Sequence, residues 1–148
     1  MRAGLYAVVD SVEYQASFSR GSDGVGLVVP GDQPCPPGFE HDERFGWWRK
    51  VPWSQVERII EVATWARDAD GYVLRLWMPP EGDMAWVAHT NDVGPFSDVP
   101  PGHPAHLRYD KNDNEWVGLM NVADLHEVTE IVRELPLAEY AAPRRATR

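Results

Sequence analysis

Two histidines and two aspartates lie close together in the second half of the chain and have the composition of a metal site. His103 and His106 are followed by Asp110 and Asp113, and imidazole combined with carboxylate suits zinc and other divalent ions. A proline between the histidines and a sequence rich in glycine and proline instead indicate exposed, unligated side chains in a loop. The sequence therefore predicts no metal here, and it predicts no cofactor.

The same region has a partial likeness to a calcium-binding loop. Asp110, Asn112 and Asn114 alternate as the first ligands of such a loop do. Glu115 stands where the loop requires glycine, and Asn121 stands where it requires its closing glutamate. The sequence therefore excludes a calcium loop of this type.

No nucleophile and no phosphate-binding loop can be recognised. The glycines between Gly21 and Gly26 have the wrong spacing for a phosphate-binding fingerprint, and they lie between two expected strands. The serines lack the surroundings of a nucleophile elbow, and Asp92 and Asp98 are expected in solvated loops. A binding protein is therefore favoured over an enzyme.

Short apolar runs alternate with turn signals along the whole chain, which is typical of antiparallel β structure. A helix over residues 53–65 is the alternative to a strand at 59–66, but the β-branched residues favour the strand. Two long loops rich in proline and glycine, 30–44 and 91–104, interrupt the pattern. The expected strands are 5–9, 12–18, 25–29, 45–51, 59–66, 72–77, 84–90, 105–109, 116–121 and 128–135.

One segment of the first half recurs in faded form in the second half. Residues 46–62 align with residues 115–131, with Trp47 on Trp116 and several positions that are apolar in both. Each copy is expected to form a strand bearing a tryptophan, a short helical turn and a closing strand. Two interpretations stay open, a true duplication and a pattern shared by unrelated β segments.

The order of elements in each half resembles a Src-homology-3-like barrel. The residues behind this resemblance are Ala3 to Tyr6, the pair Trp47 and Trp48, and Val51-Pro52 followed by Val56. The resemblance implies a mainly β fold of two small antiparallel barrel-like modules packed together, with short helical turns. It does not extend to peptide binding, because the loop that bears acids in the peptide-binding members is too short here. The expected parts are a module at 1–67, an acidic module at 68–136 and a flexible basic tail at 137–148.

Negative charge is concentrated in the second half. Residues 76–143 contain twelve acids and three bases, whereas residues 1–75 contain eleven acids and eight bases. Such a field favours a basic partner and disfavours nucleic acid and anionic membrane, although solubility alone is the alternative explanation. No stretch approaches the about 20 apolar residues of a membrane helix and no signal peptide is recognisable, so we expect a cytoplasmic protein.

Tryptophans and acids supply the candidate partner-binding residues. Adjacent residues of a strand face opposite ways, so one of Trp47 and Trp48 is expected to be exposed unless another sheet face or the other module covers it. Exposed tryptophan is frequent in binding hot spots, which makes that residue, together with Trp53, the expected aromatic contact. The expected acidic contacts are Asp92, Asp98, Asp110, Asp113 and Glu115.

The stretches from Arg2 to Ala7, from Val12 to Tyr14 and from Arg49 to Pro52 prompt a second resemblance. With them the chain resembles the small, acidic, tryptophan-rich immunity proteins of actinobacterial polymorphic-toxin systems. This resemblance implies a stoichiometric inhibitor that occludes the active site of a basic toxin domain. The alternative function is a small-ligand-binding or enzymatic β protein with a tryptophan-lined cavity under the proline- and glycine-rich loops.

Overall fold

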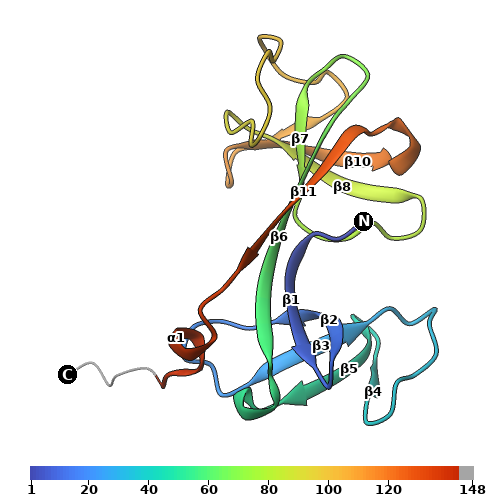
Figure 1. Cartoon of the computed structure of the whole chain (residues 1–148). Helices are drawn as coiled ribbons and strands as arrows, with labels where there is room; N and C mark the ends of the chain where they lie inside the picture. The colour runs from blue at the N-terminus through green and yellow to red at the C-terminus, as the bar shows by residue number, and fades with distance from the viewer. Residues whose placement is uncertain (144–148) are drawn as a thin grey trace. The chain divides into compact units, whose positions relative to one another are not determined.

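The computed structural model describes residues 1–143 and shows a mainly β protein (Figure 1). The described chain forms two compact units. Unit 1 contains residues 1–4 and 62–132, and the described part of unit 2 contains residues 5–61 and 133–143. The predicted antiparallel, mainly β class is confirmed, whereas closure of each unit into a barrel stays a prediction.

Unit 2 is a series of antiparallel strands. Its elements are β1 (Gly4–Val9), β2 (Val12–Ser17), β3 (Val25–Val29), β4 (Glu40–Asp42), β5 (Gly46–Val51), the 3-10 turn η1 (Trp53–Gln55) and the first residues of β6 (Arg58–Arg67). Asp10 and Ser11 have φ values of 51° and 64° and form the tight turn between β1 and β2. The hydrogen-bonded order is β4-β5-β3-β2-β1-β6, so the closing strand β6 pairs with the first strand.

Unit 1 begins with the second part of β6. Its other elements are β7 (Val73–Leu76), β8 (Met84–His89), β9 (Arg108–Asp110), β10 (Glu115–Asn121), the 3-10 turn η2 (Val122–Asp124) and β11 (His126–Glu134). The hydrogen-bonded order is β6-β7-β8-β10-β9, and β11 pairs with β6. The closing strand of this unit therefore also pairs with its first strand.

The two units share one order of elements. In each, a short edge strand (β4 or β9) pairs with a longer strand (β5 or β10), and a 3-10 turn and a closing strand follow. The turns begin at Trp53 and Val122, which are 69 positions apart, as are the aligned segments 46–62 and 115–131. The residue after each turn, Val56 or Leu125, is buried. This agreement favours duplication over a chance pattern.

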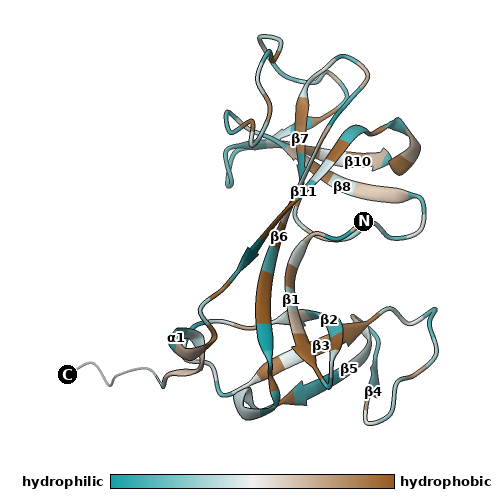
Figure 2. Ribbon diagram, viewed as in Figure 1, coloured by the Kyte–Doolittle hydropathy of each residue, from teal (hydrophilic) through white to brown (hydrophobic). Residues whose placement is uncertain are grey.

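Each unit has its own apolar core, built from the inward side chains of its strands (Figure 2). Alternating side chains face opposite sides of a strand, and β1, β3, β7 and β8 each contribute two alternate residues to a core. The core of unit 1 consists of Ala3, Ala66, Leu74, Leu76, Ala85, Val87, Leu107, Met120 and Leu125. The core of unit 2 consists of Ala7, Val9, Val25, Leu27, Phe39, Val51, Val56, Ile59 and Leu135.

The structure differs from the sequence prediction at the start of the C-terminal tail. Residues Leu137–Ala141 form the short helix α1, and Leu137 and Tyr140 pack against the core of unit 2. The Tyr140 carbonyl accepts a hydrogen bond from the Gly21 amide at 2.9 Å, and the Arg20 guanidinium lies 4.5 Å from the centre of the Tyr140 ring. Residues 137–143 are therefore part of unit 2, and residues 144–148 lie outside the described residues.

Candidate functional site

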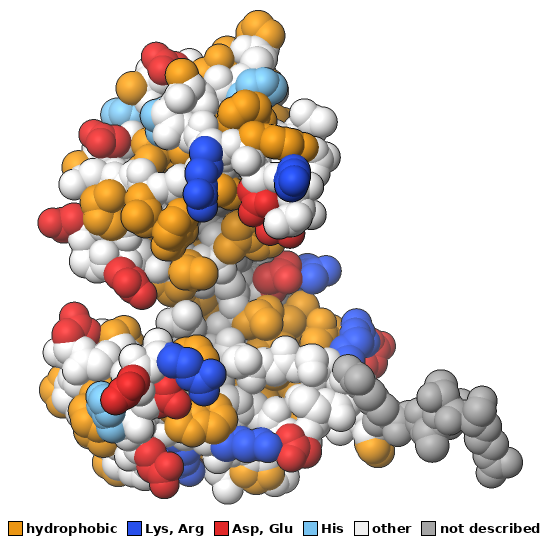
Figure 3. All heavy atoms as spheres, turned by 180° about the vertical axis from the view of Figure 1, so that it is seen from behind, with side chains coloured by type: hydrophobic (Ala, Val, Ile, Leu, Met, Phe, Trp, Pro, Cys, Tyr) orange, Lys and Arg blue, Asp and Glu red, His pale blue; other side chains and the backbone are white. Residues whose placement is uncertain are grey.

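Large apolar side chains are exposed on one side of the sheet of unit 1. On β8, Met84 and Trp86 are exposed, whereas Ala85 and Val87 between and beside them are buried. Leu119 of β10 is the Cα partner of Trp86 and is 51% exposed, against 47% for Trp86. Hydrophobic side chains of this unit also reach the surface in the view of Figure 3. We define the outer face by Trp77, Met84, Trp86 and Leu119.

Trp77 is held on this face by an arginine. Arg75 of β7 is paired with Ala88 of β8, and Trp77 follows directly after the last residue of β7. The Arg75 guanidinium lies 3.7 Å from the centre of the Trp77 ring and 5.2 Å from that of Trp65. Such cation–π contacts fix the orientation of an otherwise exposed ring. Trp77 is nevertheless 52% exposed.

Three of the predicted acids lie together, and one of them, Glu115, is near Trp77. Asp110 is the Cα partner of Glu115, and Asp113 lies in the turn between their strands. The Trp77 indole lies near the Glu115 carboxylate. Burial raises the pKa of Glu115, and the nearby charges of Asp113 and Asp110 raise it further. The structure therefore brings these acids together at the border of an exposed aromatic.

The predicted aromatic contacts lie elsewhere, on unit 2. Trp47 and Trp48 are both half-buried, so the expectation that one of the pair is exposed is wrong. The Trp47 indole donates to the Gln33 carbonyl at 2.8 Å, and the Trp48 ring fills the space beside Gly26. Trp53 is also half-buried, and its indole donates to a backbone carbonyl at 2.6 Å. These contacts stabilise unit 2.

Sequence reasoning missed Trp77 and Trp86 because it followed tryptophan clustering. A usable signal was present in Met84-Ala85-Trp86-Val87, where every residue is apolar. A strand with one side in the core needs apolar residues at alternate positions only. The additional apolar residues of this strand therefore indicate a second apolar surface.

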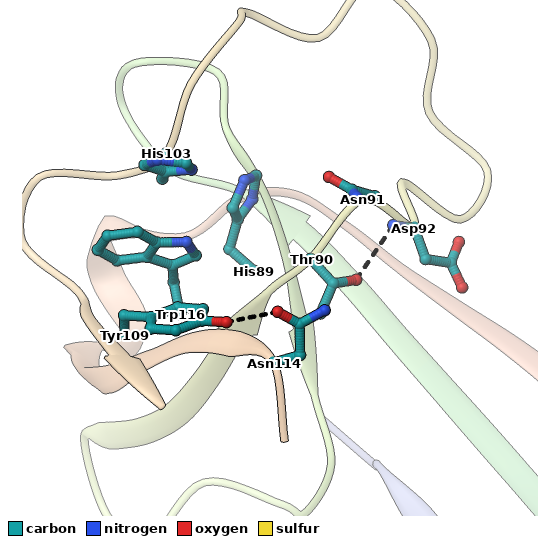
Figure 4. A pocket seen from close by; sticks show the side chains of 8 residues that line it. All are labelled: His89, Thr90, Asn91, Asp92, His103, Tyr109, Asn114 and Trp116. Carbon is teal, nitrogen blue, oxygen red and sulfur yellow. Dashed lines mark hydrogen bonds between the residues drawn. The ribbon is translucent and has the colours of Figure 1, made fainter. Parts of the chain in front are cut away.

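A cavity lies at one end of unit 1, between β8, β10 and the loop that joins β8 to β9 (Figure 4). It has a volume of about 510 Å³. The rings of His103 and Trp116 are stacked with their centres 4.2 Å apart, and Tyr109 lies at a tilt to Trp116. The remaining wall is polar and consists of His89, Thr90, Asn91, Asp92 and Asn114.

His89 and Asn114 have their orientation fixed within this wall. Nδ1 of the buried His89 lies 2.8 Å from the Val73 carbonyl oxygen. Because a carbonyl oxygen only accepts, Nδ1 is protonated and donates the hydrogen bond. Nε2 is then the ring nitrogen left for another partner. The Tyr109 hydroxyl donates to Asn114 Oδ1 at 2.5 Å, which leaves the amide NH₂ group as a donor. The cavity thus combines ring surface with oriented polar groups.

Asp92 and Asp98 lie in the loop between β8 and β9. Asp92 lines the cavity, and its carboxylate accepts a hydrogen bond from the Gly94 amide at 3.0 Å. Asp98 has a φ of 56° in a loop anchored by Arg67, which donates to the Ser97 carbonyl at 2.6 Å. The predicted acids therefore belong to two segments, this loop and the turn between β9 and β10 with its flanking residues.

His103 and His106 belong to different cavities. His103 stacks on Trp116, whereas His106 Nε2 lies 3.3 Å from the sulfur of Met120. Among residues 1–143, no group of three or more His, Cys, Asp or Glu side chains is arranged to hold a metal ion. Over the same residues, no helix has the length and apolar character needed to cross a bilayer.

Comparison with known proteins adds no family to these observations. The chain matches no protein-family model, no curated protein and no solved structure.

Proposed function

We propose that this protein binds a basic protein partner through the outer face of unit 1 and inhibits it by covering its active site. An immunity protein that neutralises a cognate toxin is the specific form of this proposal. The observation that supports it most strongly is the pairing of exposed Trp86 with exposed Leu119. The same unit contains the group of Asp110, Asp113 and Glu115, of which Glu115 is near Trp77.

The aromatic side chains supply the affinity in this proposal. Tryptophan at the centre of an interface often contributes about 2 kcal/mol or more when it is desolvated by the partner. Trp86 and Trp77 are each about half exposed in the free protein, so a partner has substantial apolar surface to cover. An outer face of this kind is also costly to leave in water, which favours a covered state.

The acids supply the preference for a basic partner. Unit 1 contains twelve acids and five bases, a net charge of −7 without histidine. A negative field accelerates the approach of a positively charged surface, and the effect falls as salt rises. Toxin domains that act on nucleic acid carry basic substrate sites, which fits this charge.

The first test is co-expression with the products of neighbouring genes, followed by purification of any complex and a growth-rescue assay. A matched pair of variants locates the interface: Trp86→Ser on the outer face and Phe45→Ser on unit 2, whose parent side chains are 47% and 48% exposed. We expect Trp86→Ser to weaken binding about 30-fold and Phe45→Ser to leave it unchanged. Equal binding by both variants would contradict the proposal.

Charge reversal tests the role of the acids separately. Replacing Asp110 and Asp113 with lysine should slow association about tenfold at low salt and flatten its dependence on ionic strength. The matching control is Glu13→Lys and Asp32→Lys on unit 2, which makes the same change in net charge. If both double variants slow association equally, only net charge matters and these acids are not at the interface.

Small-ligand binding in the cavity of Figure 4 is the second candidate function. It is favoured by the fixed orientation of His89 beside the Trp116 ring. Tryptophan fluorescence titrated with a panel of nucleotides and metal ions tests it, and Trp116→Phe assigns the signal to the cavity. A saturable change that this variant abolishes would support the candidate, and no saturable change with any member of the panel would oppose it.

A further inference from the structure

A second cavity of unit 1 adjoins the outer face and is lined by acids. It has a volume of about 400 Å³. Leu119, which belongs to the outer face, also lines this cavity, together with its neighbour Met120. The titratable side chains that line it are Asp68, Asp70, His106, Asp124 and His126. We name it the acidic pocket.

Asp68 contributes a buried oxygen that lacks a hydrogen-bond donor. The residue is 5% exposed, and its Oδ1 accepts hydrogen bonds from the amides of Asp70 and Tyr72, both at 3.0 Å. Oδ2 is buried, and none of the described residues donates a hydrogen bond to it. Such an oxygen in a folded protein usually has a partner, because leaving it without one costs about 1–3 kcal/mol or more.

The nearest basic group does not meet this need. His106 Nε2 lies 3.9 Å from Asp68 Oδ2, beyond hydrogen-bonding distance, and contacts the sulfur of Met120 instead. The His106 side chain is 41% exposed, and it lines the acidic pocket together with Asp68. The position beside Oδ2 therefore suits a donor that enters from outside.

Charge, size and shape indicate the chemistry of that donor. Three carboxylates and no lysine or arginine line the acidic pocket, so a cation is favoured. A metal ion fits poorly, because no suitable group of ligands exists among the described residues and the volume far exceeds that of an ion. Leu119 and Met120 instead offer apolar contact to an aliphatic stem that ends in a charged group.

We propose that the acidic pocket receives an arginine side chain of the protein partner, with Asp68 Oδ2 accepting from its guanidinium. The planar fork of a guanidinium matches a carboxylate better than an ammonium does. Because Leu119 belongs to both the outer face and the pocket, a partner seated on that face could insert such a side chain. This inference rests on the proposed function and names the chemistry that the partner must present.

The test uses the free protein and small probes. Uniformly labelled protein is titrated with N-acetyl-arginine amide and, as a neutral isostere, with N-acetyl-citrulline amide, while amide shifts are followed by NMR. We expect saturable shifts at Asp70, Asn121 and His126 with the arginine probe alone. Absence of saturable shifts, or equal shifts with the citrulline probe, would overturn the acidic pocket as an arginine site.

Two substitutions locate the binding group. Asp68→Asn keeps an oxygen for the two backbone amides but loses the charge, and it should weaken binding of the arginine probe about tenfold or more. Asp32→Asn, on unit 2, is the matched control and should leave binding unchanged. If Asp68→Asn is poorly folded, Asp124→Asn takes its place with the same expectation. Unchanged binding in a folded variant of either pocket acid would contradict the assignment.

The outcomes for the pocket and for the proposed function are separable. The arginine probe is tested on the free protein, so its binding does not depend on a partner. If the probe binds but Trp86→Ser does not weaken the complex, the acidic pocket is supported and the proposed function is opposed. Conversely, if Trp86→Ser weakens the complex although this protein does not bind the arginine probe, that outcome would overturn only the acidic pocket.

Discussion

Leu119 and Leu125 are the same residue type with opposite environments, and this contrast gives a quantitative test of which side of unit 1 is its core. Leu125 is 8% exposed and belongs to the apolar core, whereas Leu119 is 51% exposed on the outer face. Leu125→Ala removes three carbon groups, which at about 0.8 kcal/mol each corresponds to about 2.4 kcal/mol of lost transfer free energy. The remaining cavity raises the expected loss to about 3–5 kcal/mol.

Leu119→Ala is the matched variant, and it should change the free energy of unfolding by no more than about 0.5 kcal/mol. The assay is urea unfolding followed by both circular dichroism and tryptophan fluorescence, with the dependence on urea compared between variants. Leu125→Ala should lower the midpoint strongly, and Leu119→Ala should leave it in place while weakening partner binding. Equal losses of stability in the two variants would refute the assignment of faces.

Three further predictions concern single side chains. Burial and nearby acids raise the pKa of Glu115 above its ordinary 4.5, so its ionisation opposes folding. Glu115→Gln should therefore increase the free energy of unfolding at neutral pH. Urea unfolding across a pH series should show that this gain disappears below about pH 4.5. Gly26→Ala would overlap the ring of Trp48 and should cost about 1–3 kcal/mol in the same assay, unless the ring moves without cost. Arg67→Ala removes the hydrogen bond to the Ser97 carbonyl and should speed proteolysis of the 91–104 loop, and an unchanged cleavage rate would show that this anchor is dispensable.

Much of the fold followed from local signals in the sequence. The turn at Asp10 and Ser11, the strand 25–29 and the helical turn after Pro52 were all predicted within a residue or two. The strand at 59–66, for which a helix was the alternative, is β6. These elements depend on turn chemistry and β-branched residues close by in the chain.

The short edge strand β4 was not predicted, because it lies in a proline-rich segment and depends on pairing with β5. Its counterpart β9 was expected at residues 105–109 and lies at Arg108–Asp110, where it pairs with β10. The helix α1 was also missed, since Leu137 and Tyr140 gain their apolar contacts from distant parts of unit 2. Such elements are stabilised by tertiary contacts that no local pattern contains.

The candidate site was predictable in its acids and not in its aromatics. The acids at 110, 113 and 115 were found from charge concentration, which needs no knowledge of orientation. Whether a tryptophan is buried depends on its neighbours in space. The Trp48 ring packs against Gly26, whereas the Trp86 side chain is exposed. The buried oxygen of Asp68 likewise depends on how the chain folds around it.

The central claim is that the outer face of unit 1 contacts the partner, and hydroxyl-radical footprinting of the purified complex tests it most directly. Methionine and tryptophan are readily oxidised when exposed, so Met84, Trp77 and Trp86 report on this face and exposed Phe45 reports on unit 2. We predict that the complex protects the three outer-face residues from oxidation and leaves Phe45 as reactive as in the free protein. Protection of Phe45 with undiminished oxidation of Trp77 and Trp86 would contradict the claim.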